Sequence, residues 1–171
     1  ICHSVGWVQK EKQMDRLKEL STGEQLIVGG GALMLVASFF EWFSIDVAGL
    51  ASGGESGWGS PGSFWSVFAI LISIALALLV LGLRFGNLKL PDLPQGVTVG
   101  TIFAGGAGLI VVLMLLKAWR ITAVDCGGGI FGDSLCNTGF GIGFYIGVIA
   151  AAAVAAGAYL LYSAEKSGIT R

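Results

Sequence analysis

Residues 64–83 read FWSVFAILISIALALLVLGL, a continuous stretch without an ionisable side chain. Because the hydrocarbon core of a bilayer is about 30 Å thick, a membrane-spanning helix needs about 20 predominantly apolar residues. Three more stretches also lack ionisable side chains: 25–40, 97–116 and 139–163. We therefore predict an all-α membrane protein, a bundle of four transmembrane helices. The expected spans are about 24–45, 64–84, 97–119 and 139–163.

The overall composition agrees with a membrane protein and argues against several functional classes. Of the 171 residues, 54% are hydrophobic and 12% are charged, which lies outside the usual range of soluble domains. The formal net charge is -1 and the Lys and Arg residues are scattered, so we expect no nucleic-acid partner. The single histidine, His3, lies near the N-terminus, and the spans carry no charge at mid-membrane. We therefore predict a protein that is not an enzyme and that has no metal and no cofactor.

Positive charges are unevenly distributed among the segments that flank the spans. Lys and Arg occur before the first span, between the second and third, and after the fourth, whereas 46–63 and 121–138 contain neither. By the positive-inside rule, both termini are then cytoplasmic and these two segments lie outside. Residues 1–23 are expected to form a cytoplasmic segment, either an amphipathic helix on the membrane surface or a frayed helix in water. Residues 164–171 are expected to form a cytoplasmic tail.

Tryptophans and two charged residues fall near the predicted outer ends of the spans. The expected interface anchors, where amphipathic rings favour the headgroup level, are Trp42, Trp58, Trp65 and Trp119. Glu41 and Lys117 are set just inside the same boundary. Because a charge at this depth is costly unless it is paired, we predict an ion pair between them. The alternative is that the two side chains reach the headgroups independently.

Two cysteines, Cys126 and Cys136, lie in the second segment predicted to be outside. An oxidising compartment favours a disulfide between them, and the alternative is a pair of free thiols. Closing so short a loop would contribute about 2–3 kcal/mol to stability by the loop-entropy argument.

Small residues recur at every fourth position of the spans. Because lipid tails are as apolar as leucine, membrane helices associate through close contact of such residues. The predicted helix-packing residues are Gly139, Gly143, Gly147, Ala151 and Ala155 in the fourth span, Gly100, Ala104 and Gly108 in the third, and Ala69, Ser73 and Ala77 in the second. All of these faces can be used inside the bundle, or one of them can bind a neighbouring subunit.

Residues 20–24, LSTGE, fit a helix capping box and place the start of the first helix near Thr22. Together with the residues that follow, they resemble the opening of small, uncharacterised four-span membrane proteins of actinobacteria. The residues that carry this resemblance are Gly30, Leu33, Phe39, Phe40, Trp42, Phe43, Gly57, Trp58, Pro91, Pro94, Phe140 and Gly141. The resemblance implies a multi-pass protein of the bacterial plasma (inner) membrane and no activity. The cysteine pair departs from this pattern.

We therefore expect a non-catalytic integral membrane protein whose partners are the bilayer and either other membrane subunits or further copies of itself. It would serve as an accessory or structural subunit of a larger membrane complex, or as a homo-oligomer. Two alternatives stay open. One is a small transporter or channel component with a path lined by Ser and Thr, although the broken helices of transporters are absent from the pattern. The other is a module that binds the cell envelope through its outer loops.

Overall fold

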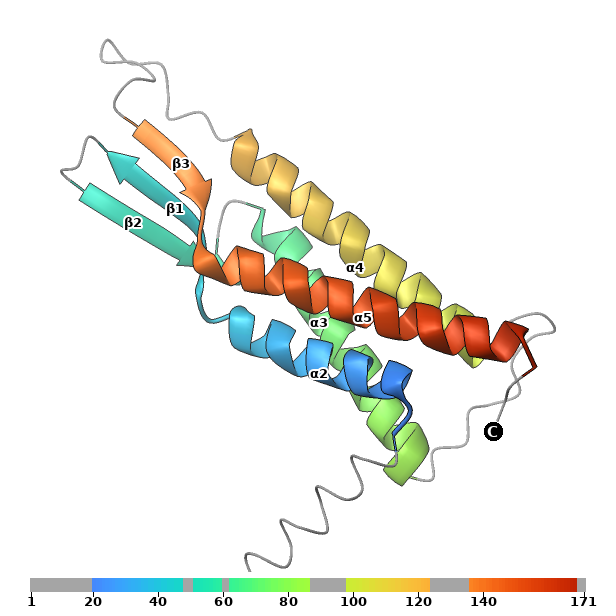
Figure 1. Ribbon diagram of the computed structural model, residues 1–171. Helices are drawn as coiled ribbons and strands as arrows, with labels where there is room; N and C mark the ends of the chain where they lie inside the picture. The colour runs from blue at the N-terminus through green and yellow to red at the C-terminus, as the bar shows by residue number, and fades with distance from the viewer. Residues whose placement is uncertain (1–19, 48–50, 60–61, 87–97, 124–135, 169–171) are drawn as a thin grey trace, which may run out of the picture.

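The computed structural model describes residues 20–47, 51–59, 62–86, 98–123 and 136–168. In this part of the chain the helices form a bundle, and a small sheet lies at one end of it (Figure 1). The helices are α2 (Thr22–Ala37), α3 (Ser63–Phe85), α4 (Val99–Thr122) and α5 (Ile142–Lys166). The strands are β1 (Glu41–Val47), β2 (Ala51–Ser56) and β3 (Cys136–Phe140).

Three of the helices, α3, α4 and α5, are long and apolar enough to cross a membrane. They have 23, 24 and 25 residues and coincide closely with three of the predicted spans. Helix α2 is also apolar but has only 16 residues. At a rise of 1.5 Å per residue it is about 24 Å long, which is less than the thickness of a typical hydrocarbon core. The described chain is therefore mostly helical and fits a membrane protein.

The N-termini of α2 and α4 are capped by side chains. The N–H of Glu24 donates to Ser21 Oγ at 3.4 Å, and the N–H of Ser21 donates to Glu24 Oε2 at 2.7 Å. This capping box confirms that the first helix begins at Thr22. In α4 the N–H of Thr101 donates to Thr98 Oγ1 at 3.3 Å. These bonds satisfy amide groups that have no partner within their own helix.

The prediction of an all-α protein is wrong, because three strands are present. The predicted span 24–45 joins two different elements, since α2 ends at Ala37 and β1 begins at Glu41. In β1 the residues alternate, with Phe43 and Ile45 separated by Ser44 and followed by Asp46. A period of two, with aromatic and β-branched side chains, favours a strand over a helix. The predicted span 139–163 likewise begins in β3, and its helix starts at Ile142.

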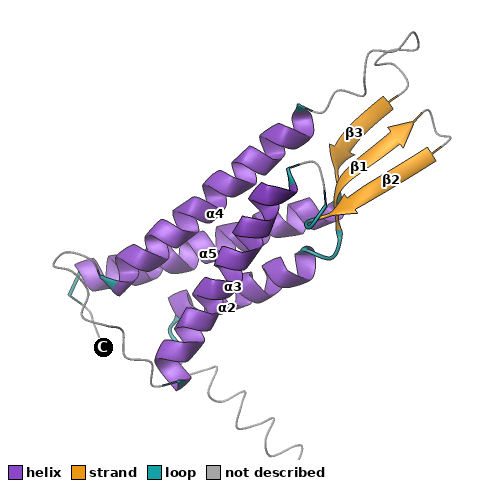
Figure 2. Ribbon diagram, turned by 180° about the vertical axis from the view of Figure 1, so that it is seen from behind, coloured by secondary structure: helices purple, strands orange, loops and turns teal. Residues whose placement is uncertain are grey.

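The sheet is antiparallel and has the strand order β2-β1-β3. β1 pairs with β2 from Val47↔Ala51 to Glu41↔Ser56, with an irregularity between Glu41 and Phe43. It pairs with β3 from Val47↔Cys136 to Phe43↔Phe140. The sheet extends beyond the ends of α2 and α5, on the same side as the end of α4 (Figure 2). The two segments predicted to lie outside are thus brought together at one end of the bundle.

Close contacts through glycine hold α2 between its neighbours. A Cβ added at Gly30 would lie 2.7 Å from Val154 Cγ2 on α5, and one added at Gly31 would lie 2.7 Å from Ala77 Cβ on α3. Real Cβ atoms essentially never come so close, so α2 can approach both helices only because it lacks side chains at these positions. The buried residues of the four helices form a continuous apolar core.

Candidate functional site

The end of the bundle that carries the sheet is closed by Trp42, which is fully buried. Its indole N–H donates to the carbonyl of Ala37 at 2.7 Å. Added Cβ atoms at Gly143 and Gly147 would lie 2.6 Å and 3.0 Å from its ring, so α5 is shaped to receive it. The ring also makes an edge contact with Phe144, with centroids 6.1 Å apart. The prediction that Trp42 is an interface anchor is wrong, because it is a core residue that joins the sheet to the helices.

The other three predicted anchors lie closer to the surface at the same end. Trp119 is 62% exposed and Trp58 is 40% exposed, and Trp65 is half-buried. The indole N–H of Trp58 donates to Ser38 Oγ at 3.1 Å, which leaves its ring at the edge of the bundle. This position suits rings at a headgroup boundary, and their role as anchors stays a prediction.

Lys117 is buried beneath the sheet end of the bundle. Its Nζ donates to the carbonyl of Gly59 at 3.3 Å, and the carboxylate of Glu55 is near enough to attract its charge. The side chain of Glu41 instead lies against Gly54 of β2, since a Cβ added to Gly54 would lie 2.5 Å from the carboxyl carbon of Glu41. These contacts join Glu41 and Lys117 to different groups, and the ion pair between them stays a prediction. Strand β2 and the loop after it supply groups that face the lysine, whereas Glu41 on β1 lies against the neighbouring strand.

Three buried serines bond to backbone carbonyls inside the bundle. Ser66 Oγ donates to the carbonyl of Gly57, Ser73 Oγ donates to that of Ala69, and Ser38 Oγ donates to that of Leu35. Their hydroxyl groups are engaged within the bundle, so they do not line an open polar path in the described chain. The bond from Ser66 instead ties the loop after β2 to α3.

The predicted small-residue positions have different surroundings. Those of α3 are buried, and Ser73 and Ala77 lie in close contact with Gly31 of α2. In α5, Gly143 and Gly147 pack against the ring of Trp42. Gly139 belongs to β3 and is therefore not a helix-packing residue. The remaining positions are Ala151, which is buried, Ala155, which packs against the core, Gly100, which lies close to α5, and Ala104, which is half-buried.

Gly108 of α4 differs from the others, because an added Cβ there would meet nothing within 4 Å, and the same holds for Gly105. Both glycines belong to a stripe of exposed residues spaced alternately by four and three, which places them on one side of the helix. This outward face of α4 consists of Thr101, Gly105, Gly108, Val112, Leu115 and Trp119. The opposite side of α4, from Gly100 through Phe103 to Ile121, is buried in the bundle.

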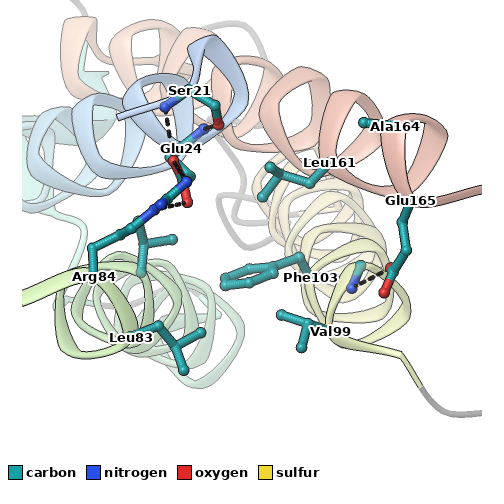
Figure 3. Close-up of a pocket in the computed structure, with 11 residues that line it drawn as sticks. Ser21, Glu24, Leu83, Arg84, Val99, Phe103, Leu161, Ala164 and Glu165 are labelled. Atoms are coloured by element: carbon teal, nitrogen blue, oxygen red, sulfur yellow. Dashed lines mark hydrogen bonds and ion pairs between the residues drawn. The ribbon is translucent and has the colours of Figure 1, made fainter. Parts of the chain in front are cut away.

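A pocket of about 390 Å³ lies at the end of the bundle opposite the sheet (Figure 3). All four helices contribute to it, and we call it the helix-end pocket. Its apolar lining consists of Val80, Leu83, Val99, Phe103, Leu161 and Ala164, and its polar lining includes Ser21, Glu24, Arg84 and Glu165. The pocket thus combines an apolar wall with a few charged groups, which is the usual composition of a small-molecule site.

The charged groups of the helix-end pocket are held in defined positions. Arg84 Nε lies 2.7 Å from Glu24 Oε1, and Arg84 Nη2 donates to Glu24 Oε2 at 3.1 Å. On the other side, Glu165 Oε2 accepts the N–H of Gly100 at 2.9 Å, near the start of α4. Phe103 and Leu161 lie between these two groups (Figure 3).

The helix-end pocket is not predictable from the sequence alone. Its interacting residues are far apart in the sequence: Glu24 and Arg84 are separated by 60 positions, and Gly100 and Glu165 by 65. In the sequence, Arg84 is only one of the positive charges between the second and third spans, and Glu165 falls in the expected tail, 164–171. The available signal was a carboxylate in the terminal turn of a helix, Glu24 at the start of α2 and Glu165 at the end of α5, but the partners of these carboxylates depend on which helices are neighbours.

The predicted disulfide cannot be followed in the structure. Cys126 lies outside the described residues, and only the backbone of Cys136, in β3, is described. The disulfide stays a prediction. In the described ranges, no group of three or more His, Cys, Asp and Glu side chains could hold a metal ion.

No protein-family model matches this sequence, and no curated protein is significantly similar to it.

Proposed function

We propose that this chain is a non-catalytic integral membrane protein that works by association, as a subunit of a larger membrane complex or as a homo-oligomer. In this proposal all four helices lie in a bacterial plasma membrane, both termini are cytoplasmic and the sheet lies outside. Helix α2 is short, but Phe39 and Phe40, 72% and 46% exposed, extend its apolar surface past its end. Tilting of the adjacent helices or local thinning of the bilayer accommodates the remaining difference between the length of α2 and the thickness of the hydrocarbon core.

The outward face of α4 is the observation that carries the proposal. Helix surfaces in contact with lipid can hold large apolar side chains, and those of α3 and α5 do so at Phe68, Leu78 and Ile149. Gly105 and Gly108 instead leave a shallow strip in the middle of α4, with nothing in the described chain within 4 Å of the position of a side chain. Such a strip lets another helix backbone approach closely, and close approach is the main source of helix association in lipid.

Replacing Gly105 and Gly108 together by leucine is the test of this surface. We expect the double variant to remain folded, because both positions are open, and to lose its association with a second subunit. Native mass spectrometry of the protein extracted in a mild detergent measures the association. A matched control is Gly29→Leu on α2, which is also open but lies on another helix. A monomer without partners in the unmodified protein, or an unchanged assembly in the double variant, would contradict the proposal.

The projecting sheet favours a second candidate, a module that binds the cell envelope. In the order β2-β1-β3, the outer edges of β2 and β3 have no strand neighbour in the described chain. Open strand edges can pair with other extended chains or present polar backbone groups. Sedimentation of the detergent-purified protein with isolated cell-wall sacculi tests this candidate, and protein that stays entirely in the supernatant rejects it. The buried serines, which bond within the bundle, offer no support for a channel.

A further inference from the structure

We propose that the helix-end pocket binds a phospholipid with an ethanolamine headgroup. The ammonium group would contact Glu165, the phosphate would contact Arg84, and the upper part of an acyl chain would lie against Phe103 and Leu161. This inference goes beyond the association proposed above, because no residue of the outward face of α4 lines the pocket.

The arrangement of charge in the pocket matches a zwitterionic headgroup. Arg84 and Glu24 lie on one side of it and Glu165 on the other (Figure 3). Glu24 binds the Nε and Nη2 atoms of Arg84, whose side chain is 49% exposed, so its Nη1 edge can bind a phosphate oxygen. Glu165 uses one carboxylate oxygen to accept the N–H of Gly100, which leaves the second oxygen for an ammonium group. With two carboxylates and one guanidinium, the lining favours a ligand that brings an additional positive charge.

The apolar lining favours a lipid over a soluble amine. Phe103 is almost fully buried, and Val80, Leu83 and Leu161 come from helices on different sides of the pocket. The volume of about 390 Å³ lies within the range of about 300–1,000 Å³ that is usual for small-molecule sites. It accommodates a headgroup with the first carbons of an acyl chain. The rest of the lipid would continue along the apolar outer surface of the helices, where the bilayer provides its solvent.

Lipid binding to the purified protein tests this assignment. The protein, stripped of lipid in detergent, is titrated with phosphatidylethanolamine, phosphatidylglycerol or soluble phosphoethanolamine, and the bound fraction is measured by native mass spectrometry. We expect phosphatidylethanolamine to bind about tenfold more tightly than phosphatidylglycerol, the change that one charge-assisted hydrogen bond produces. Equal binding of the two lipids would overturn the proposal. Binding of phosphoethanolamine as tight as that of the lipid would assign the site to a soluble ligand and also overturn it.

Two variants separate the headgroup contacts from a general effect on folding. Glu165→Gln keeps an oxygen that accepts the N–H of Gly100 but removes the charge, so the preference for phosphatidylethanolamine should fall about tenfold. Arg84→Gln should weaken the binding of both phospholipids to a similar extent, since both carry the phosphate. Glu41→Gln at the sheet end is the matched control and should bind like the unmodified chain. A Glu165→Gln protein that melts normally and keeps the full preference would refute the role of this carboxylate.

Discussion

Replacing Trp42 by alanine is expected to destabilise the protein by about 3–5 kcal/mol, the usual cost of removing a buried aromatic ring. The indole is fully buried, fits against Gly143 and Gly147, and donates a hydrogen bond to the end of α2. Its loss would leave a cavity where the sheet meets the helices. Since each kcal/mol shifts the melting temperature of a chain of this size by about 2–4 °C, thermal unfolding in detergent should show a decrease of about 10 °C.

Trp119→Ala is the matched control for this prediction. The ring of Trp119 is 62% exposed at the same end of the bundle, so its removal should change stability in detergent by less than about 1 kcal/mol. Equal losses of stability in the two variants would mean that Trp42 does not close the bundle.

Gly30→Val is expected to force α2 away from α5. The added Cβ would lie 2.7 Å from Val154 Cγ2 and 2.9 Å from the carbonyl oxygen of Ala150. A flexible side chain could move aside, but a helix backbone cannot, so we expect a loss of about 3 kcal/mol or more. The measurement is the denaturant concentration at which half of the purified protein is unfolded, with helix content as the signal.

The adjacent glycine provides the control. Gly29→Val adds the same side chain to the same helix, and nothing in the described chain lies within 4 Å of the new Cβ. It should therefore be close to neutral. If Gly29→Val destabilised the protein as much as Gly30→Val, the cause would be the effect of valine on the helix and not the contact between α2 and α5.

Long apolar segments were predictable from the sequence because their signal is local. Helices α3, α4 and α5 follow from uninterrupted apolar composition, and the start of α2 follows from the capping box of Ser21 and Glu24. The buried helix positions Ala69, Ser73 and Ala77 follow from the spacing of small residues. Each of these predictions depends on residues within one helix.

The pairing of β1 with β3 could not be predicted in the same way, because the two strands are far apart in the sequence. Phe43 of β1 pairs with Phe140 of β3, which lies far along the chain, and no local pattern indicates that these two segments are partners. The apolar residues around Phe39 and Phe40 also continue the composition of α2. Sequence analysis therefore extended the first helix through Trp42 and interpreted a core residue as an anchor at the membrane surface.

The contacts of charged residues depended on the sheet as well. The interpretation of Glu41 and Lys117 as a pair assumed that both project from helices at the same depth. Because Glu41 is in a strand, its side chain lies over Gly54, and Lys117 donates a hydrogen bond to the carbonyl of Gly59. The helix-end pocket depends on the packing of the helices instead, since Arg84 and Glu24 meet only when α2 and α3 are neighbours.

The proposed topology, with the sheet outside and the helix-end pocket inside, has a direct test. A single cysteine is introduced at Gly53, in an open position of β2, or at Ser167, after α5, in a chain whose three native cysteines are replaced by serine. A maleimide that cannot cross membranes should label Gly53→Cys in intact cells and Ser167→Cys only after the membrane is opened. Labelling of Ser167→Cys in intact cells, or recovery of the protein in the soluble fraction, would contradict the account.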